Sequence, residues 1–153
     1  MAGSEEHRDL TWPEIAERLS VSPMWWIATA SPAAGPHSVP VSGVVVDEVA
    51  LSYADPASRR VRDLAEDPRC AVHLESASDV LIVHGQLQDL GEAAADPAGV
   101  AAYARKYSAP EEAEFLPGAP QMSGVRLLAL RPVRAMAWRL DDFFGSQRRW
   151  SAG

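Results

Sequence analysis

The chain has 153 residues, and its 14 Lys and Arg against 21 Asp and Glu give a formal net charge of −7. This length predicts one domain over residues 1–153, because domains of roughly 100 to 150 residues are the commonest, and the acidic balance excludes a general nucleic-acid binder, which needs a basic face. No run approaches the roughly 20 apolar residues that span a bilayer, and the chain starts polar and acidic, unlike a signal peptide. We therefore expect a cytoplasmic protein without nucleic-acid or membrane partners, in which residues 1–10 form a flexible N-terminus.

A short helix and two strands are predicted over the first third of the chain. The helix begins at Thr11–Glu14, which has the form of a capping box. An aromatic and β-branched strand follows over residues 25–30. The next strand, residues 37–46, alternates polar and apolar residues and has a bulge or bend at Gly43. Pro40 lacks an amide hydrogen, so we expect it at an edge of the sheet or where its amide side faces no neighbouring strand.

Most of the remaining elements are strands joined by short turns. Ser58 can cap one helix, which is expected to turn Val61, Leu64 and Ala65 toward the core and to end at Asp67, the residue before a proline. The other predicted elements are strands over residues 49–54, 70–75, 80–90, 125–130 and 133–140, with a bulge at Gly85, a helix that starts at Asp96-Pro97, and a short helix near residues 111–115.

The connections between the strands indicate the fold class. Parallel neighbours would need a helical crossover after nearly every strand, and only the segment 58–67 resembles one. Short turns favour an antiparallel sheet instead. The sequence therefore predicts a mainly β, α+β fold, a six- to seven-stranded antiparallel barrel with a few peripheral helices.

Positive charge is concentrated at the start of the helix that Ser58 caps. Arg59 and Arg60 occupy its first turn, where the helix dipole disfavours cations by some tenths of a kcal/mol. An anion resolves this conflict, because the free amides, the Ser58 hydroxyl and two guanidinium groups then converge on it, and phosphate suits that geometry. The alternative is that these arginines are solvated or pair with Asp55 and Asp63.

Other kinds of site find less support in the sequence. His37, His73 and His84 lie on separate strands without metal-ligand spacing, and the single Cys70 excludes both an intramolecular disulfide and a thiolate cluster. No metal is proposed. The sequence also lacks the nucleophile elbow of serine hydrolases and the glycine-rich phosphate loops of dinucleotide and ATP folds. No side chain is singled out as catalytic.

The order of the segments resembles a known family over nearly the whole chain. The segments that carry the resemblance are Trp26–Ala30, Gly35–Val41, Leu51–Ala54, Ser58–Leu64, Asp67–Ser76, Val80–Gly85, Ala137–Leu140 and Arg149-Trp150. In this order and spacing, they resemble the pyridoxamine 5'-phosphate oxidase-like family of split β-barrel flavin and deazaflavin proteins.

The resemblance implies a six-stranded antiparallel split barrel that forms a homodimer, with two cofactor sites in the grooves between subunits. Family members hold the cofactor phosphate at the positions of Ser58, Arg59, Arg60 and Arg62. The strand with Val39, Pro40 and Val41 is expected to lie along the ring, with its main chain bonding the polar edge of the ring, and His37 to line the site. The cofactor implied is FMN or the 5-deazaflavin coenzyme F-420.

The leading functional hypothesis is a dimeric oxidoreductase that transfers a hydride between FMN or F-420 and a small planar or conjugated substrate. The first alternative is a non-catalytic protein that binds or sequesters a flavin, haem or tetrapyrrole in the same groove. The second is a dimeric interaction module with an empty groove, which the arginine cluster argues against. Oxidation of pyridoxamine phosphate itself is not favoured, because the C-terminal segment offers no counterpart to that substrate's phosphate-binding residues.

Overall fold

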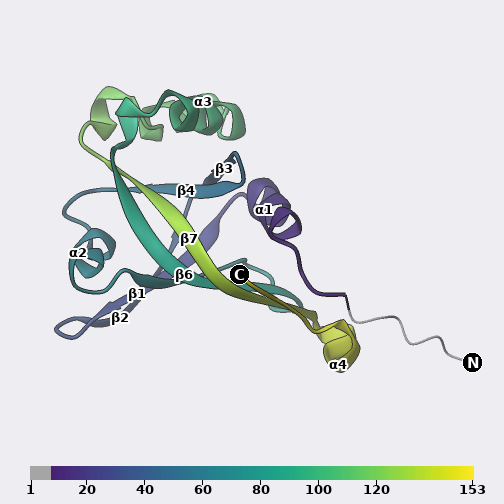
Figure 1. Ribbon diagram of the computed structural model, residues 1–153. Coiled ribbons are helices and arrows are strands. Elements are labelled where there is room, and N and C mark those ends of the chain that lie inside the picture. Colours follow the sequence, from purple (N-terminus) through teal and green to yellow (C-terminus); the bar gives the residue numbers. More distant parts are fainter. Residues whose placement is uncertain (1–7) are drawn as a thin grey trace, which may run out of the picture.

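One antiparallel sheet organises the part of the chain that the structure, a computed structural model, describes, which is residues 8–153. The sheet curls into a half-barrel, and helices lie around it (Figure 1). Its strands are β1 (Trp25–Ser31), β2 (Gly35–Val41), β3 (Val44–Val46), β4 (Val49–Ala54), β5 (Arg69–His73), β6 (Asp79–Glu92), β7 (Arg126–Arg139) and β8 (Arg148–Ser151). They run in the order β2-β1-β5-β6-β7-β4-β3, and β8 also pairs with β7. The expected mainly β, antiparallel split-barrel fold is confirmed.

Helices occupy the rim and the two ends of the sheet. The α-helices are α1 (Trp12–Val21), α2 (Arg59–Glu66), α3 (Pro97–Lys106) and α4 (Phe143–Ser146), and the 3-10 helices are η1 (Ala93–Ala95), η2 (Pro110–Phe115), η3 (Pro120–Met122) and η4 (Leu140–Asp142). Helix α3 lies beyond β3 and β4, α2 lies near β1 and β2, and α4 lies at the far end of β7 (Figure 1). In the described residues, no helix is long and apolar enough to cross a membrane.

The two longest strands, β6 and β7, bend together at a bulge. Gly85 pairs with Pro132 while His84 pairs with Arg134, so the register shifts here. The predicted bulge at Gly85 is confirmed, and a Cβ at this position would overlap the Arg131 carbonyl oxygen. The predicted break into strands 125–130 and 133–140 is wrong. Pro132 lies at the bulge, where the ladder is already irregular, so its missing amide does not end the strand.

The predicted strand over residues 37–46 is two strands on opposite edges of the sheet. Strand β2 pairs with β1, whereas β3 pairs with β4, and the chain turns between them at Ser42-Gly43. This turn joins the two edges of the sheet path and helps to curl the sheet. Pro40 lies on the edge strand β2, as expected.

Gly43 is required at this turn by the packing of Trp25. A Cβ at Gly43 would overlap the Trp25 ring, which is 2% exposed in the core. We expect Gly43→Ala to lower the free energy of unfolding by about 1 to 3 kcal/mol, the usual cost of overpacking a core. Urea unfolding followed by tryptophan fluorescence measures this. Gly35→Ala is the comparison, because a Cβ there meets no neighbour and its positive φ of 72° makes any loss of stability a matter of backbone strain alone. An unchanged stability of Gly43→Ala would contradict the steric explanation.

Two apolar clusters fill the structure. The larger lies within the half-barrel and includes Trp25, Val83 and Leu128, with α1 packing Ile15 and Leu19 into it. The smaller lies between α3 and the strands β3, β4 and β7, and its members include Val44, Leu51, Tyr103 and Leu127. The second cluster places α3 at one end of the barrel, next to the turn at Ser42-Gly43.

Helix α2 differs from its prediction in the face that it buries. Ser58 caps it and Asp67 ends it, as expected. Its buried residues, however, are Arg60 and Asp63, while Leu64 is half-buried and Ala65 is exposed. A polar face is therefore turned toward the protein. This face belongs to the candidate site.

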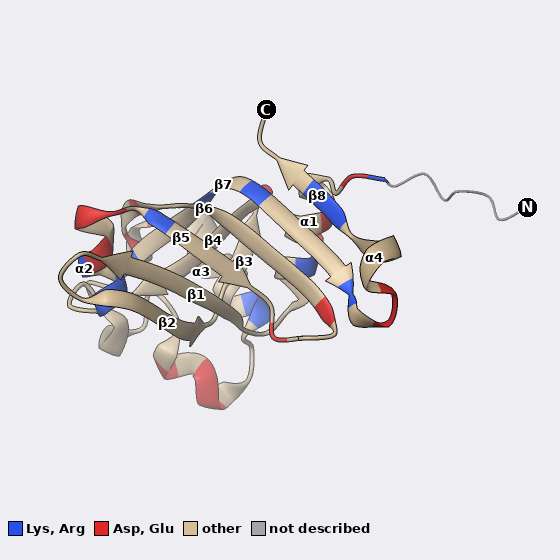
Figure 2. Ribbon diagram, turned by 90° about the horizontal axis from the view of Figure 1, so that it is seen from below, with Lys and Arg blue, Asp and Glu red and all other residues tan. Residues whose placement is uncertain are grey.

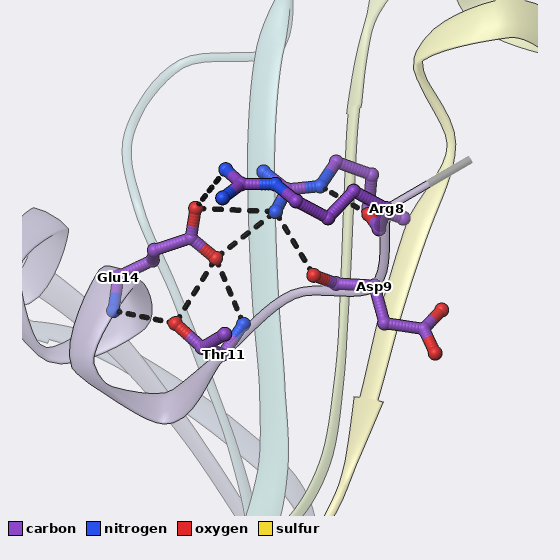
Figure 3. A network of polar contacts seen from close by, with 5 residues as sticks. Arg8, Asp9, Thr11 and Glu14 are labelled. Carbon is purple, nitrogen blue, oxygen red and sulfur yellow. Dashed lines mark hydrogen bonds and ion pairs between the residues drawn. The ribbon is translucent and has the colours of Figure 1, made fainter. Parts of the chain in front are cut away.

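The N-terminal segment that the structure describes is fastened to the C-terminal strand. The Glu14 carboxylate accepts hydrogen bonds from the Thr11 amide, from Arg8 and from Arg148 (Figure 3). The Leu10 amide donates to the Arg149 carbonyl oxygen at 3.0 Å. The expected flexible N-terminus falls mostly on residues 1–7, which lie outside the described residues. The strand β8, which holds this segment, was not predicted because four residues carry too short a pattern.

Candidate functional site

A groove of about 540 Å³ lies between the edge strand β2 and the start of α2. Figure 2 shows α2, with its blue basic segments, beside the β1–β2 hairpin. The residues that line the groove are Met24, His37, Val39, Pro40, Val41, Ser42, Tyr53, Ser58, Arg59, Arg60 and Phe115. Seven of the eight residues predicted for the cofactor site therefore lie in one groove.

A turn after β4 presents the N-terminus of α2 to the groove. The Asp55 carboxylate accepts from the Ala57 amide at 2.7 Å, and the Asp55 carbonyl accepts from the Ser58 amide at 2.9 Å. The Ser58 hydroxyl oxygen then accepts from the Val61 amide at 3.3 Å as the helix cap. Its proton is still available, because a hydroxyl group both accepts and donates.

Arg59 is held by a buried carboxylate. Its Nε donates to Asp63 Oδ1 at 2.9 Å, one turn along the helix, and Asp63 is 0% exposed. The Thr29 hydroxyl donates to Asp63 Oδ2 at 2.7 Å from strand β1. The sequence offered two roles for Arg59, anion binding and pairing with Asp63. The two roles are compatible, because one guanidinium nitrogen pairs with Asp63 and the group has further N–H donors.

The pKa of Asp63 reflects these contacts. Burial raises the pKa of this carboxyl, but hydrogen bonds from the hydroxyls of Thr29 and Ser31 lower it. With the Arg59 guanidinium beside it, the pKa of Asp63 lies below its ordinary value. Asp63 is therefore a charged group that fixes Arg59 to strand β1.

Arg60 is a buried cation with an unused donor. It is 8% exposed, and its Nη2 donates to the Tyr53 carbonyl oxygen at 3.0 Å. Its Nε has no hydrogen-bond partner among the described residues. Burial lowers the pKa of Arg60, because a desolvated charge is unfavourable. Arg60 lines the groove, so an anion there would offset part of the desolvation of its charge.

Strand β2 supplies the second wall. His37, Val39 and Val41 share one face of the strand, since side chains alternate with a period of two. His37 Nδ1 is buried without a hydrogen-bond partner among residues 8–153. Because β2 is an edge strand, its outer N–H and C=O groups are free to bond a ligand.

Arg62 does not join the groove. It is exposed, and it is absent from the groove lining. Positions two apart on a helix point in directions about 200° apart, so Arg60 and Arg62 cannot face the same ligand. The prediction that Arg62 contacts the cofactor phosphate therefore lacks support from the geometry.

Four groove residues were not predicted. Ser42 directly follows the predicted Val41, whereas Met24, Tyr53 and Phe115 come from three distant segments, and no local motif marks any of them. The pairing of Asp63 with Arg59 can be predicted from the sequence, because Asp63 lies four residues after Arg59, the spacing of a helical ion pair.

The arrangement suits a ligand with an anionic end and a flat polar-edged body. One end of the groove offers a hydroxyl and two guanidinium groups, and phosphate matches this donor set. The other end offers an apolar strand face and free main-chain groups. These features fit a phosphate-bearing ring cofactor.

The chain matches one protein-family model. The model is described as pyridoxamine 5'-phosphate oxidase, and the match covers residues 11–139. No curated protein matches the chain in sequence.

Solved structures share the fold at low sequence identity. A conserved hypothetical protein from Mycobacterium tuberculosis has a TM-score of 0.65 at 18% identity, and the match covers 89% of both chains. A heme binding protein from Mycobacterium smegmatis has a TM-score of 0.65 at 16% identity, with 94% of this chain and 59% of that chain covered. An F-420 reductase has a TM-score of 0.60 at 17% identity, with 78% of this chain and 94% of that chain covered. At these identities the likeness concerns the fold alone.

Proposed function

The chain belongs to the pyridoxamine 5'-phosphate oxidase family, and on this basis we propose that it is a dimeric oxidoreductase that binds FMN or coenzyme F-420 in the groove. The reaction proposed is hydride transfer between the cofactor ring and a small planar or conjugated substrate. The observation that carries the proposal is the convergence of Ser58, Arg59 and the buried cation Arg60 on the groove that β2 lines. The F-420 reductase among the structural neighbours supports the proposal at the level of the fold.

The phosphate end of the cofactor would be held by Ser58, Arg59 and Arg60. Arg59 is pre-oriented by Asp63, and Arg60 by the Tyr53 carbonyl, so little side-chain entropy is lost when an anion binds. Arg62 is not part of this set, because it is exposed outside the groove.

The ring would lie along β2. The outer main chain of Val39, Pro40 and Val41 can bond the polar edge of a ring, and His37 lines the same wall. The cofactor supplies the hydride chemistry, so the protein contributes position, charge and exclusion of water. No side chain has to act as a strong acid or base.

The proposed dimer places a cofactor site at each subunit interface. Its support in this chain is the apolar surface, since Leu140, Phe143 and Phe144 are 64%, 40% and 86% exposed around α4. Contiguous exposed apolar side chains are typical of interaction sites. Residues 1–153 would form one domain of this dimer.

A haem- or tetrapyrrole-binding protein is the second candidate. The observation that favours it is His37, an imidazole with a buried unpartnered Nδ1 in the groove, since imidazole is a common haem ligand. The heme binding protein among the neighbours is consistent with this alternative at the level of the fold.

Titration of the purified protein with FMN, F-420 and haemin tests both candidates. Cofactor fluorescence follows the first two, and the Soret band follows the third. The proposal expects saturable binding of FMN or F-420, followed by reduction or oxidation of the bound ring by a hydride donor or acceptor. Binding of haemin alone, lost in His37→Ala, would support the second candidate. Binding of none of the three would contradict both.

A further inference from the structure

A second pocket of about 140 Å³ adjoins the groove at the end of β2. Both cavities are lined by Met24, Ser42, Tyr53 and Phe115, so the two share a wall. The second pocket adds Tyr103 of α3 and Glu112 of η2, together with Tyr107 and Leu116, the residues that directly follow these two helices. A cavity of roughly 150 Å³ is large enough for a benzene ring. The second pocket therefore has room for one small planar group beside the groove.

Aromatic rings dominate the walls of this second pocket. Tyr53 and Tyr103 pack edge to face with their centroids 5.1 Å apart, and Tyr103 and Tyr107 stack at 5.6 Å. Phe115 is 55% exposed at the wall shared with the groove. A further flat ring can extend this cluster with the offset or edge contacts that aromatic pairs prefer.

The phenol protons of the pocket are already committed to the backbone. The Tyr53 hydroxyl donates to the Phe115 carbonyl oxygen at 2.7 Å, and the Tyr107 hydroxyl to the Pro23 carbonyl oxygen at 2.7 Å. The Tyr103 hydroxyl donates to the Ser42 carbonyl oxygen at 3.1 Å. A phenol has one proton, so none of the three is left to donate to a ligand anion.

The charges around the pocket also disfavour an anion. Glu112 lines the pocket. Burial raises the pKa of the Tyr107 phenol, and the nearby Glu112 carboxylate raises it further. The nearest cations are engaged elsewhere. Lys106 Nζ donates to the carbonyl oxygens of Ser22 at 2.7 Å and Gly43 at 2.6 Å, and Arg60 donates to the Tyr53 carbonyl. Neither of these cations lines the pocket.

From this juxtaposition we propose that the pocket between α3, η2 and the end of β2 binds an uncharged planar ring and rejects carboxylates. The proposal that this pocket holds the substrate of hydride transfer rests on the proposed function, because a ring bound there lies beside a ring bound along β2. The proposal that the pocket binds uncharged rings does not depend on the cofactor. In this arrangement the groove binds the anionic cofactor, and the adjoining pocket binds the uncharged substrate.

Benzamide and benzoate test the proposal, because they match in shape and differ in charge. Calorimetric titration of the cofactor-free protein, in a dilute inorganic phosphate buffer that fills the anion end of the groove, is expected to give benzamide about tenfold tighter binding than benzoate, the effect of one carboxylate at short range in a partly exposed site. Glu112→Gln should narrow this ratio to about twofold, without changing the affinity for FMN or F-420. The matched control is Glu114→Gln, an exposed residue of the same short helix outside the pocket lining, which should leave the ratio unchanged.

The outcomes separate the pocket from the proposed function. Equal binding of the two probes, or a ratio that Glu112→Gln does not change, would overturn the pocket assignment even if FMN or F-420 binds. Selective binding of benzamide in a protein that binds neither cofactor would leave the pocket assignment standing and remove the oxidoreductase. The absence of benzamide binding would overturn the pocket assignment directly.

Discussion

The Arg59→Ser, Arg60→Ser double variant is expected to bind FMN or F-420 about 10² to 10⁴ times more weakly than the wild-type protein. A hydrogen bond to a charged group contributes about 1.5 to 3 kcal/mol, so two lost guanidinium contacts cost about 3 to 6 kcal/mol of binding free energy. Both residues line the groove beside the Ser58 hydroxyl. Fluorescence titration of each cofactor measures the change in Kd.

The same helix offers a matched control for this prediction. Arg62→Ser removes an equal charge from α2, but Arg62 is exposed and lies outside the groove. We expect it to change the affinity less than threefold, since only distant, screened electrostatics is lost. A loss like that of the double variant would show that the phosphate site extends to Arg62, contrary to the geometry.

The single variant Arg59→Ser separates the effect of this arginine from that of the buried Arg60. Because it also removes the cation that pairs with the buried Asp63, thermal unfolding is measured alongside binding to confirm that the protein is folded. Arg59→Ser is expected to weaken binding about tenfold to a hundredfold with the melting transition still cooperative. Undiminished affinity in a folded Arg59→Ser protein would remove Arg59 from the proposed site.

Replacement of Asp63 by alanine is expected to lower the free energy of unfolding by about 1 to 3 kcal/mol, the usual cost of leaving a buried donor without its acceptor, because the partly exposed Arg59 can turn to solvent. The substitution leaves the Thr29 hydroxyl and the Arg59 Nε without their acceptor beneath α2. Urea unfolding at pH 7 measures the loss. Glu66→Ala, an exposed position at the end of the same helix, is the control and should change stability by less than about 0.5 kcal/mol.

The pH dependence of the Asp63 contribution has a definite sign. The pKa of Asp63 is lowered in the folded protein, so the ionised form is favoured by folding. Its contribution is fully present above the unfolded-state pKa of about 3.9 and is lost as the pH falls through the lower folded-state pKa. The difference between the wild-type protein and Asp63→Ala should therefore be constant from pH 6 to 8 and shrink below about pH 4. A difference that does not change down to pH 2 would contradict this account.

Local patterns predicted much of the candidate site. Ser58, Arg59 and Arg60 follow from the conflict between a helix N-terminus and two cations. The resemblance to the family supplied His37, Val39, Pro40 and Val41, and the missing amide of Pro40 predicted only its position at an edge of the sheet. The structure brings these residues into one groove. Arg62, which the resemblance to the family added to this set, is exposed outside the groove lining, and its contact with the phosphate stays a prediction.

The long-range parts of the site could not be predicted. Tyr53 and Phe115 meet through the hydrogen bond from the Tyr53 hydroxyl to the Phe115 carbonyl, across 62 positions of sequence. The burial of Asp63 depends on Thr29 in a different strand. Neither contact can be predicted from the residues around it, because tyrosine, phenylalanine, aspartate and threonine also occur at exposed positions that make no such contact.

The sequence by itself determined the positions of β1, β4, β5 and β6, the helix caps at Thr11 and Ser58, the bulge at Gly85 and the basic start of α2. Each of these depends on backbone geometry within a few residues, where proline, glycine, capping side chains and the helix dipole act directly. Only the tertiary structure decided that β2 and β3 part at Gly43, that α2 buries Arg60 and Asp63, and that the groove meets an aromatic pocket. These features arise because side chains from distant segments pack against one another, and such packing depends on the positions of all the elements in the fold.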